Sequence, residues 1–412
     1  MDTLGWVNEL NSIEPDAPFD DLEWVRELVG DARVVALGEG AHFIEELWTV
    51  RRRLVRFLCE GLGFRLIAAE FDLGEGEDLA GWLANPADAR DLRTVSRGAA
   101  DWGMASTAHW LRSWGAPRGI RFAGLDAPNG GAAIATTLAW VADALRELDP
   151  DAAPVLERIE PIVSSLSGTS VAASAQAWTA LEVARQDALT AGLARLHQRV
   201  GFLDAVLAER GGRARVVGLR RRLAALQCAD YALRANEAMH RGAEAQLDTS
   251  ARDRFMADSL LALLESEPGM RVVLLAHNGH VQKQPVVWGD YLSAHPLGMY
   301  LDRTLGDAYR VIGTTTTGRG SSEMELDPSV PVGFRVVQAA LEPPQPGSLE
   351  AALLAAGFGD RLALASLRRA AAAGLTFQRI RAQSGYLTSD VAAAYDAIIS
   401  LPRLTVQRDL GF

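Results

Sequence analysis

The chain lacks the features that mark membrane, secreted and nucleic-acid-binding proteins. Its 412 residues contain no apolar run of about eighteen residues and no basic segment followed by an apolar core at the N-terminus. We therefore expect neither a membrane span nor a signal peptide, and we predict a cytoplasmic protein. The formal net charge of −11 at pH 7 disfavours nucleic acid as a partner, because a face that binds phosphates needs clustered cations.

Cysteine, lysine and two common catalytic motifs are also scarce or missing. Cys59 and Cys228 are the only cysteines, and their helix-like surroundings predict buried thiols rather than a disulfide or a nucleophile. Lys283 is the only lysine among the 41 basic residues. The sequence has no Gly-x-Ser-x-Gly elbow and no His-Glu-x-x-His motif. A serine nucleophile and a zinc site on a helix are therefore disfavoured.

What the chain does contain is a large apolar fraction and one conspicuous run near its start. Hydrophobic residues make up 49% of the sequence, enough for a sizeable core. Four apolar residues, 34–37, lead into Gly38-Glu39-Gly40-Ala41-His42, after which a helical spacing of apolar side chains begins. Such a continuous run predicts a parallel strand buried on both faces. Glu39 and His42 then lie at its carboxyl end, where α/β sheets bind ligands, unless they only cap the following helix.

The same arrangement returns three more times along the chain. Apolar runs at 65–70 and 121–126 end in Glu70 and Asp126, and a run at 271–276 ends in His277-Asn278-Gly279-His280. Helical patterns separate the first three runs. Because the carboxyl ends of parallel strands share one edge of a sheet, we expect these polar side chains to lie together.

These patterns predict an α/β fold, a three-layer α/β/α sandwich with a mainly parallel sheet. Residues 1–130 and 267–412 would form the core, and residues 131–266, which show helical spacing and no credible strand, would form an all-helical insertion that shapes the cleft. Helical spacing is also found over 2–30. We expect further strands at 309–313 and 333–337, and a helical tail beyond 348 that leads to a last apolar stretch at 397–399.

The residues gathered at the predicted edge are suited to hydrolysis. A histidine such as His42 can take a proton from water, and a neighbouring carboxylate, Glu39 or Glu70, fixes its tautomer and raises its basicity. His277, His280 or Arg51, which follows His42 by about two and a half helical turns, could then donate hydrogen bonds to a developing oxyanion. The rival chemistry is a divalent metal such as zinc, held by histidines and carboxylates of the same set.

Several segments, in order, resemble the erythromycin esterase family. They span roughly residues 33–345 and comprise Gly38-Glu39-Gly40-Ala41-His42-Phe43, Leu62-Gly63-Phe64 with Ala69-Glu70-Phe71, Gly124-Leu125-Asp126, Met256-Ala257-Asp258-Ser259, Ala276-His277-Asn278-Gly279-His280 and Gly333-Phe334-Arg335-Val336. The stretch from His277 to Pro285 is similar to the fuller His-Asn-x-His-x-Gln-Lys-x-Pro pattern of one macrolide esterase branch.

The resemblance implies a carboxylic ester hydrolase that opens the lactone ester of a macrolide antibiotic without a metal cofactor. It implies His42 as the base, Glu39 as its partner and Glu70 as the acid of the second strand. It also implies catalytic roles for Arg51 and for the pair His277 and His280. The expected partner is therefore a small molecule, a macrolide or related polyketide, with no nucleic acid and no membrane. The sequence indicates no oligomeric state.

Three further residues are expected to support the site, namely Asp126, Asn278 and Lys283. Asp126 would orient a catalytic group or cap the turn at 128–131, and Lys283 would pair with an acid of the cleft. The strand-end acids would form an anionic rim that favours the protonated amino sugar of a macrolide.

Two other functions remain open from the sequence. The same edge could serve a biosynthetic tailoring enzyme that carries out another acyl transfer, a cyclisation or an elimination. A non-catalytic binding protein is less consistent with the complete set of site residues.

Overall fold

The computed structural model describes residues 5–166, 168–240, 250–288, 292–327, 329–330, 332–408 and 410–411. Parts of both predicted units, including residues 1–4, 241–249 and 289–291, lie outside the described residues. None of the helices in the described ranges is both long and apolar enough to cross a lipid bilayer.

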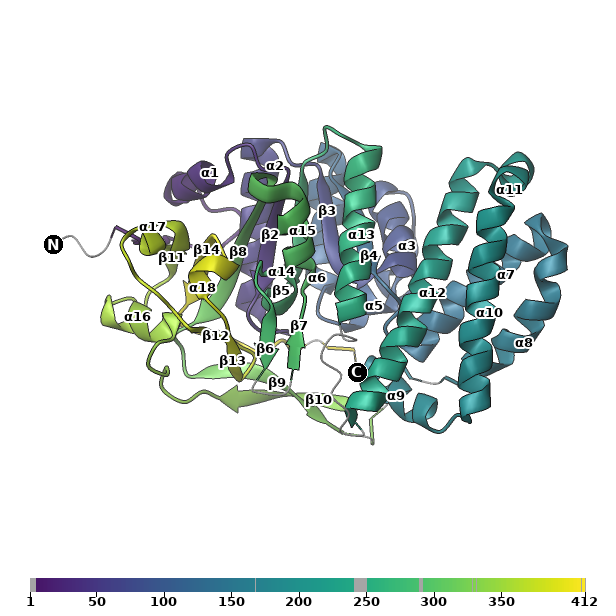
Figure 1. Ribbon diagram of the computed structural model, residues 1–412. Helices are drawn as coiled ribbons and strands as arrows, with labels where there is room; N and C mark the ends of the chain where they lie inside the picture. Colours follow the sequence, from purple (N-terminus) through teal and green to yellow (C-terminus); the bar gives the residue numbers. More distant parts are fainter. Residues whose placement is uncertain are drawn as a thin grey trace.

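A central sheet of eight strands organises the molecule (Figure 1). Its order is β1-β11-β14-β8-β2-β5-β3-β4. The six strands from β14 to β4 are parallel, whereas β11 is antiparallel to both of its neighbours. The strands are β1 (Val7–Glu9), β2 (Val34–Glu39), β3 (Leu66–Asp72), β4 (Arg121–Asp126), β5 (Val272–His277), β8 (Tyr309–Thr316), β11 (Ala363–Ser366) and β14 (Ala397–Leu401).

Helices cover both faces of this sheet, which explains why β2 and β5 are buried along their whole length. One face packs against α1 (Glu23–Val29), α2 (Glu45–Leu62), α3 (Leu73–Ala84) and the short helices α4 (Leu92–Val95), α5 (Arg97–Asp101) and α6 (Ala105–Trp110). The other face packs against α13 (Ser250–Ser266), α14 (Asn278–Val281), α15 (Leu297–Leu305), α16 (Leu349–Ala355), α17 (Leu367–Ala372) and α18 (Val391–Ala394). The predicted α/β class with a mainly parallel sheet is confirmed.

The described residues between 131 and 266 carry helices and no strand. Six of these helices enclose an apolar core of their own and stand beside the β4 edge of the sheet (Figure 1). They are α7 (Gly131–Leu148), α8 (Ala153–Ser164), α9 (Val171–Thr179), α10 (Val183–Phe202), α11 (Asp204–Gly211) and α12 (Arg213–His240). The last helix of this stretch, α13, instead packs on the central sheet through Met256, Leu260 and Leu264.

Two small antiparallel sheets complete the fold. β9 (Gly320–Leu326) pairs with β10 (Phe334–Ala340) as a hairpin. The second sheet has the order β12-β13-β6-β7 and joins β12 (Arg379–Ala382) and β13 (Gly385–Thr388) to β6 (Val286–Trp288) and β7 (Leu292–Ala294). The strand expected at 333–337 therefore exists, but it belongs to the hairpin and not to the central sheet.

The predictions for the two ends of the chain were wrong in part. Residues 2–30 were expected to be helical, but β1 precedes α1 and adds to the edge of the central sheet. The tail between 348 and the last apolar stretch was also expected to be helical, yet it contains β11, β12 and β13, while the apolar stretch at 397–399 forms β14. These strands have four or five residues and alternate with short helices. Periodicity alone does not distinguish a short apolar strand from part of a buried helix, and here the alternation with short helices favoured the helical interpretation.

Candidate active site

The parallel register of the central sheet brings the predicted residues together. β2 and β5 run side by side with Glu39 opposite His277, and β3 flanks β5 and carries Glu70. Gly38 and Gly40, on either side of Glu39, allow Asn278 and Thr314 to pack closely against the end of β2. A Cβ at Gly38 would lie 2.3 Å from Oδ1 of Asn278, and one at Gly40 would lie 2.7 Å from the carbonyl oxygen of Thr314.

His42 and Glu39 form the centre of the site. Nδ1 of His42 lies 2.7 Å from Oε1 of Glu39, and the His42 side chain is 31% exposed while that of Glu39 is 10% exposed. Burial lowers the pKa of His42, but the hydrogen bond and charge of Glu39, with the charge of Glu70, outweigh it and raise the pKa overall. With Nδ1 held by Glu39, Nε2 has no hydrogen-bond partner among the described residues and is the nitrogen left to accept a proton.

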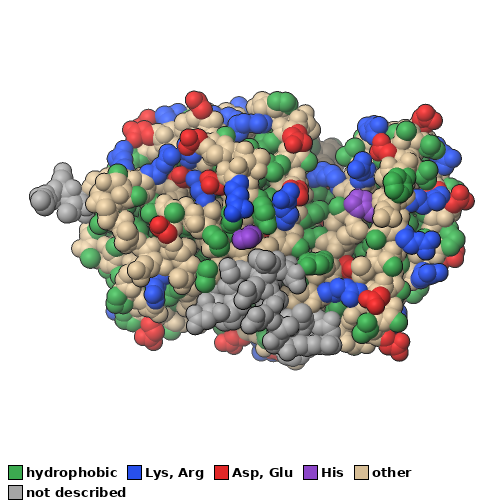
Figure 2. Space-filling model, viewed as in Figure 1, with side chains coloured by type: hydrophobic (Ala, Val, Ile, Leu, Met, Phe, Trp, Pro, Cys, Tyr) green, Lys and Arg blue, Asp and Glu red, His purple; other side chains and the backbone are tan. Residues whose placement is uncertain are grey.

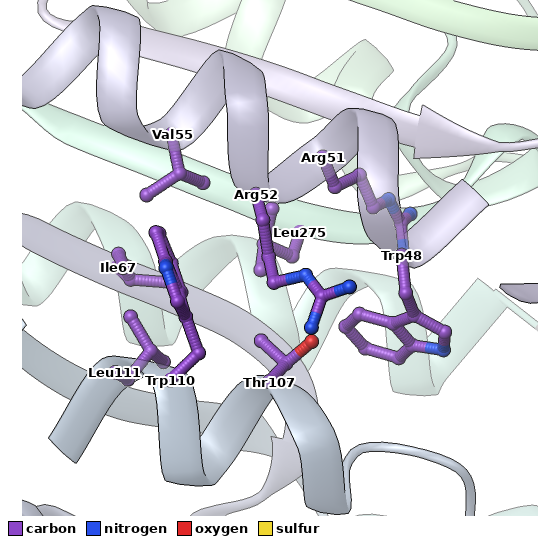
Figure 3. A pocket seen from close by; sticks show the side chains of 9 residues that line it. All are labelled: Trp48, Arg51, Arg52, Val55, Ile67, Thr107, Trp110, Leu111 and Leu275. Carbon is purple, nitrogen blue, oxygen red and sulfur yellow. The ribbon is translucent and has the colours of Figure 1, made fainter. Parts of the chain in front are cut away.

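Arg51 fixes the other oxygen of Glu39. Its Nη1 donates to Oε2 of Glu39 at 2.8 Å, and its Nη2 donates to the carbonyl oxygens of Leu37, at 2.9 Å, and Ala276. The guanidinium lies 5.4 Å from the ring centroid of Trp48, in a small pocket between α2, the sheet and α6 (Figure 3). Burial raises the pKa of Glu39, yet Arg51 and His42 lower it overall, so this carboxylate stays ionised.

His277 lies beside His42 as a neutral imidazole. The two ring centroids are 4.8 Å apart. Nδ1 of His277 accepts a hydrogen bond from the backbone N–H of Gly279 at 3.1 Å, so the proton of the neutral ring is on Nε2. That Nε2 is buried and has no hydrogen-bond partner in the part of the chain that the structure describes. Burial and the neighbouring His42 lower the pKa of His277 to about 3.

Glu70 and His280 belong to a second charged group next to the first. Oε2 of Glu70 accepts the backbone N–H of His277 at 3.0 Å, and its Oε1 lies 3.2 Å from Nε2 of His280. Nδ1 of His280 lies 2.7 Å from Oδ1 of Asp253. Burial lowers the pKa of His280, but Asp253 and Glu70 raise it to about 10. His280 is therefore a cation with both ring nitrogens engaged by carboxylates.

Asp126 is also paired with a cation. It is fully buried, and Nε of Arg252 donates to its Oδ1 at 3.0 Å and to its Oδ2 at 2.9 Å. Asp126 in addition accepts the backbone N–H of Ala127 and the side-chain amide of Asn129, both at 2.8 Å, so it also caps the turn as expected. Arg252 reaches Oε1 of Glu70 at 2.8 Å as well.

The expected anionic rim was therefore wrong. Each of the three strand-end acids is held by at least one cation, namely Arg51 for Glu39 and Arg252 for Glu70 and Asp126. On the face shown in Figure 2, described acidic and basic side chains intermingle and form no large area of one sign.

The side chains of Asn278 and Lys283 make contacts that stabilise the fold. The fully buried Asn278 side chain donates to the carbonyl oxygen of Thr314 at 2.7 Å and accepts its N–H at 3.2 Å, which ties the end of β5 to β8. Nζ of Lys283 lies 2.8 Å from Oδ2 of Asp396 and 3.6 Å from Oδ1 of Asp302. Neither acid belongs to the strand-end set, so the expected pairing of Lys283 with an acid of the cleft was wrong.

Sequence reasoning missed Arg252 and Asp253, at the start of α13. They connect this helix to β3, β4 and the turn after β5 through Glu70, Asp126 and His280. The adjacent charges Arg252 and Asp253, four and three residues before the Met256-Ala257-Asp258-Ser259 segment, were the available signal.

The described side chains form no metal-binding group of three or more histidine, cysteine, aspartate or glutamate residues. Cys59 and Cys228 are free, and burial raises the pKa of both thiols to about 12. They are therefore protonated at neutral pH and are poor nucleophiles.

Comparisons with known proteins identify the family of this chain. A family model described as erythromycin esterase matches residues 59–404. Two relatives from Escherichia coli are erythromycin esterase type II, 29% identical with 95% of this chain and 94% of the relative covered, and erythromycin esterase type I, 29% identical with 96% and 97% covered. The family match begins after Glu39, His42 and Arg51, but the alignments with these relatives extend over almost the whole chain.

Solved structures give the same result. The chain is similar to a histidine-to-asparagine mutant of the erythromycin esterase EreC in its open conformation, with a TM-score of 0.91, 27% identity, and 98% of this chain and 100% of that chain covered. A succinoglycan biosynthesis protein shares the fold with a TM-score of 0.71 at 21% identity, covering 97% of this chain and 95% of that chain.

The motifs from Gly38 to Val336 indicate the same family as the family model, the full-length relatives and the shared fold. The chain belongs to the erythromycin esterase family, a family of carboxylic ester hydrolases, as its sequence predicts.

Proposed function

We propose that this enzyme opens the lactone ester of a macrolide such as erythromycin with a water molecule activated by His42, and that it thereby protects a cell from the antibiotic. One observation carries the proposal. Nδ1 of His42 is held by Glu39, and the ring of His277 lies beside the ring of His42. The buried Nε2 of His277 has no hydrogen-bond partner among the described residues.

The first step is proton removal from water. The N–H at Nδ1 of His42 donates a hydrogen bond to Glu39, so the lone pair of Nε2 accepts a proton from the water while the water oxygen forms a bond to the ester carbonyl carbon. Arg51 acts through Glu39 by keeping that carboxylate ionised and oriented. When the tetrahedral intermediate collapses, the bond between the carbonyl carbon and the ester oxygen breaks, and His42 returns the proton to the leaving alkoxide. The new carboxylic acid then releases its own proton to solvent, so the products are a carboxylate and an alcohol on one opened chain.

His277 is the group best suited to the oxyanion. It carries its proton on Nε2 and stays neutral near pH 7, so it can donate a hydrogen bond without adding charge to the ground state. His280 is less suited, because both of its ring nitrogens already have partners. Nη1 and Nη2 of Arg51 are also engaged, while its buried Nε has no partner among the described residues. We assign Glu70 to holding the backbone of His277 and His280 to holding Glu70.

We also propose that no metal ion takes part. His42 and Glu39 form a hydrogen bond with each other, and His280 is protonated between two carboxylates. A protonated imidazole has no lone pair to give to a metal, so metal binding would require this group of charges to be rebuilt.

We propose that the helices α7–α12 border the substrate cleft. A second small pocket lies between the turn after β4 and helices α7, α9 and α12, and its lining includes Asn129, Ile134, Cys228, Leu233 and Arg252. Since Arg252 also contacts Glu70, this pocket adjoins the charged group that supports His277.

The test is to incubate the purified enzyme with a panel of macrolides in isotopically labelled water. We expect a mass gain of one water, with one labelled oxygen in the new carboxylate, no effect of chelators, and a loss of about 10²–10⁴-fold in kcat for His42→Ala. Expression in a susceptible strain should raise the minimum inhibitory concentration. Near-normal turnover by folded His42→Ala, or rate loss on chelation that zinc restores, would contradict the mechanism. Turnover without water addition would favour a tailoring enzyme.

A further inference from the structure

Two residues in the described chain combine a side chain other than glycine with a positive φ, and both lie at the loop that carries His42. Phe43, with φ of 59°, follows the histidine directly, and Gln383, with φ of 51°, belongs to the turn between β12 and β13. Residues with a Cβ rarely adopt this backbone region, and they do so mainly where surrounding contacts enforce it, often at functional sites. We call residues 40–44 the His42 loop.

Gln383 holds the His42 loop with two hydrogen bonds. The backbone N–H of His42 donates to Oε1 of Gln383 at 2.6 Å, and the backbone N–H of Gln383 donates to the carbonyl oxygen of Gly40 at 2.7 Å. The contact joins residues 341 positions apart in the sequence.

Ser322, in β9, holds the other side of the same residue. Its hydroxyl donates to the carbonyl oxygen of His42, and its side chain is fully buried. The turn and β9 are themselves joined, because the backbone N–H of Ser384 donates to Oε2 of Glu323 at 3.3 Å. The backbone N–H and the carbonyl oxygen of His42 are thus both bonded to side chains from separate parts of the C-terminal third.

Other segments fix the two ends of the His42 loop. The N–H of Gly40 donates to Oγ1 of Thr314 at 2.8 Å, and the carbonyl oxygen of Phe43 accepts the N–H of Gln407 at 2.8 Å. These bonds anchor the residues around His42. Within the described residues, only Gln383 and Ser322 contribute side chains that form hydrogen bonds with the backbone of His42 itself.

We propose that Gln383 and Ser322 are positioning residues that set the direction of the His42 imidazole toward the reacting water. The inference rests on the proposed function of His42 as the base. A base acts only when its nitrogen is within hydrogen-bond reach of the water, and a displacement of about 1 Å can cost about 100-fold in rate. Gln383 is the first of the two residues that connect β12 to β13, where a tight hairpin turn requires a positive φ, and from this position it makes both hydrogen bonds to the loop.

The first experiment compares three variants of Gln383 in the full chain. Gln383→Met removes the acceptor at similar size, and we expect kcat to fall about 10–100-fold with little change in KM. Gln383→Glu keeps an oxygen for the N–H of His42 and should retain most of kcat at its optimal pH. Its negative charge would raise the pKa of His42, as the charges of Glu39 and Glu70 do, against the positive charge of His280, which lowers it. The acidic limb of its rate profile should therefore move to higher pH.

Gln383→Gly separates positioning from stability. Glycine adopts positive φ without a steric cost and keeps the backbone bond to Gly40, but it loses the bond to His42. We expect a melting temperature within about 2–4 °C of the wild type and a kcat as low as that of the Met variant. A Gly or Met variant that folds and retains full kcat would overturn the assignment.

Ser322 has a matched control next to it in the sequence. Ser321 is equally buried, but its hydroxyl has no hydrogen-bond partner within the described residues. We expect Ser322→Ala to lower kcat several-fold and Ser321→Ala to leave it unchanged. Equal effects of the two substitutions would show that Ser322 contributes only to packing.

A readout without catalysis separates this inference from the proposed function. The Cε1 proton of His42 can be followed by NMR across a pH titration in the wild type and in Gln383→Met. We expect the titration curve or the chemical shift of His42 to change, whether or not a macrolide is turned over. Absence of turnover by the wild type would contradict the proposed function alone, whereas an unchanged His42 resonance would contradict the positioning role.

Discussion

The imidazole rings of His42 and His277 lie 4.8 Å apart, centroid to centroid, and their surroundings move their pKa values in opposite directions. Burial acts on both rings, but Glu39 and Glu70 raise the pKa of His42 overall, while burial and His42 lower that of His277 to about 3. Neighbouring titratable groups with diverging pKa values are typical of an acid–base site. The pair thus combines a ring that accepts a proton with a ring that stays a neutral donor.

The pH profile should report His42. Because the base must be unprotonated and its pKa is raised, we expect the acidic limb of kcat/KM above the ordinary histidine value of about 6.5. Glu39→Gln removes the negative charge that raises this pKa, so the limb should move to lower pH and kcat should fall about 10²–10⁴-fold. A limb that stays in place in Glu39→Gln would contradict the pairing.

Replacing His277 should lower the rate without moving the acidic limb of the pH profile. We expect His277→Ala to lower kcat about 10²–10³-fold, the usual cost of losing an oxyanion donor. Because the His277 ring is neutral, its removal should leave the acidic limb of the pH profile near the pKa of His42. His197→Ala, in the helical unit, is the control and should retain activity. Steady-state kinetics across pH measure both quantities, and a small rate loss for His277→Ala would place the oxyanion elsewhere.

The ion pair of Arg252 and Asp126 should be visible in stability. Arg252→Met leaves the fully buried Asp126 without its cation, which typically costs about 3–5 kcal/mol in the free energy of unfolding. The double variant with Asp126→Asn should recover part of that loss, because no unpaired charge remains. Urea denaturation of the wild type, both single variants and the double variant gives the coupling. Additive effects would show that the two residues do not interact.

Lys283 should affect folding more than catalysis. Its partner Asp396 is buried and accepts the N–H of Val311 at 2.8 Å, at the start of the paired strands β8 and β14. Lys283→Met should therefore lower the melting temperature and leave kcat within about threefold of the wild type, a change worth less than 1 kcal/mol in the barrier. Loss of turnover equal to that of His42→Ala, in a folded protein, would place Lys283 among the catalytic residues.

The candidate site could be predicted where its residues follow an apolar run. Glu39, Asp126 and His277 each end a strand of the central sheet, Glu70 lies two residues before the end of β3, and parallel strands bring such ends to one edge. The sequence could not indicate which charge pairs with which. Arg252 lies in a helix with no distinctive spacing, and its bonds to Asp126 and Glu70 cross 126 and 182 positions of the chain.

The amino-acid sequence by itself determined the four buried strands, the parallel sheet and the order of the candidate catalytic side chains, because hydrophobic period and strand-end polarity are local properties of the chain. Only the tertiary structure decided that Glu39 holds the ring of His42 and that Gln383 and Ser322 hold its backbone. The last two lie in short strands and turns, whose positions depend on packing between distant segments rather than on their own composition.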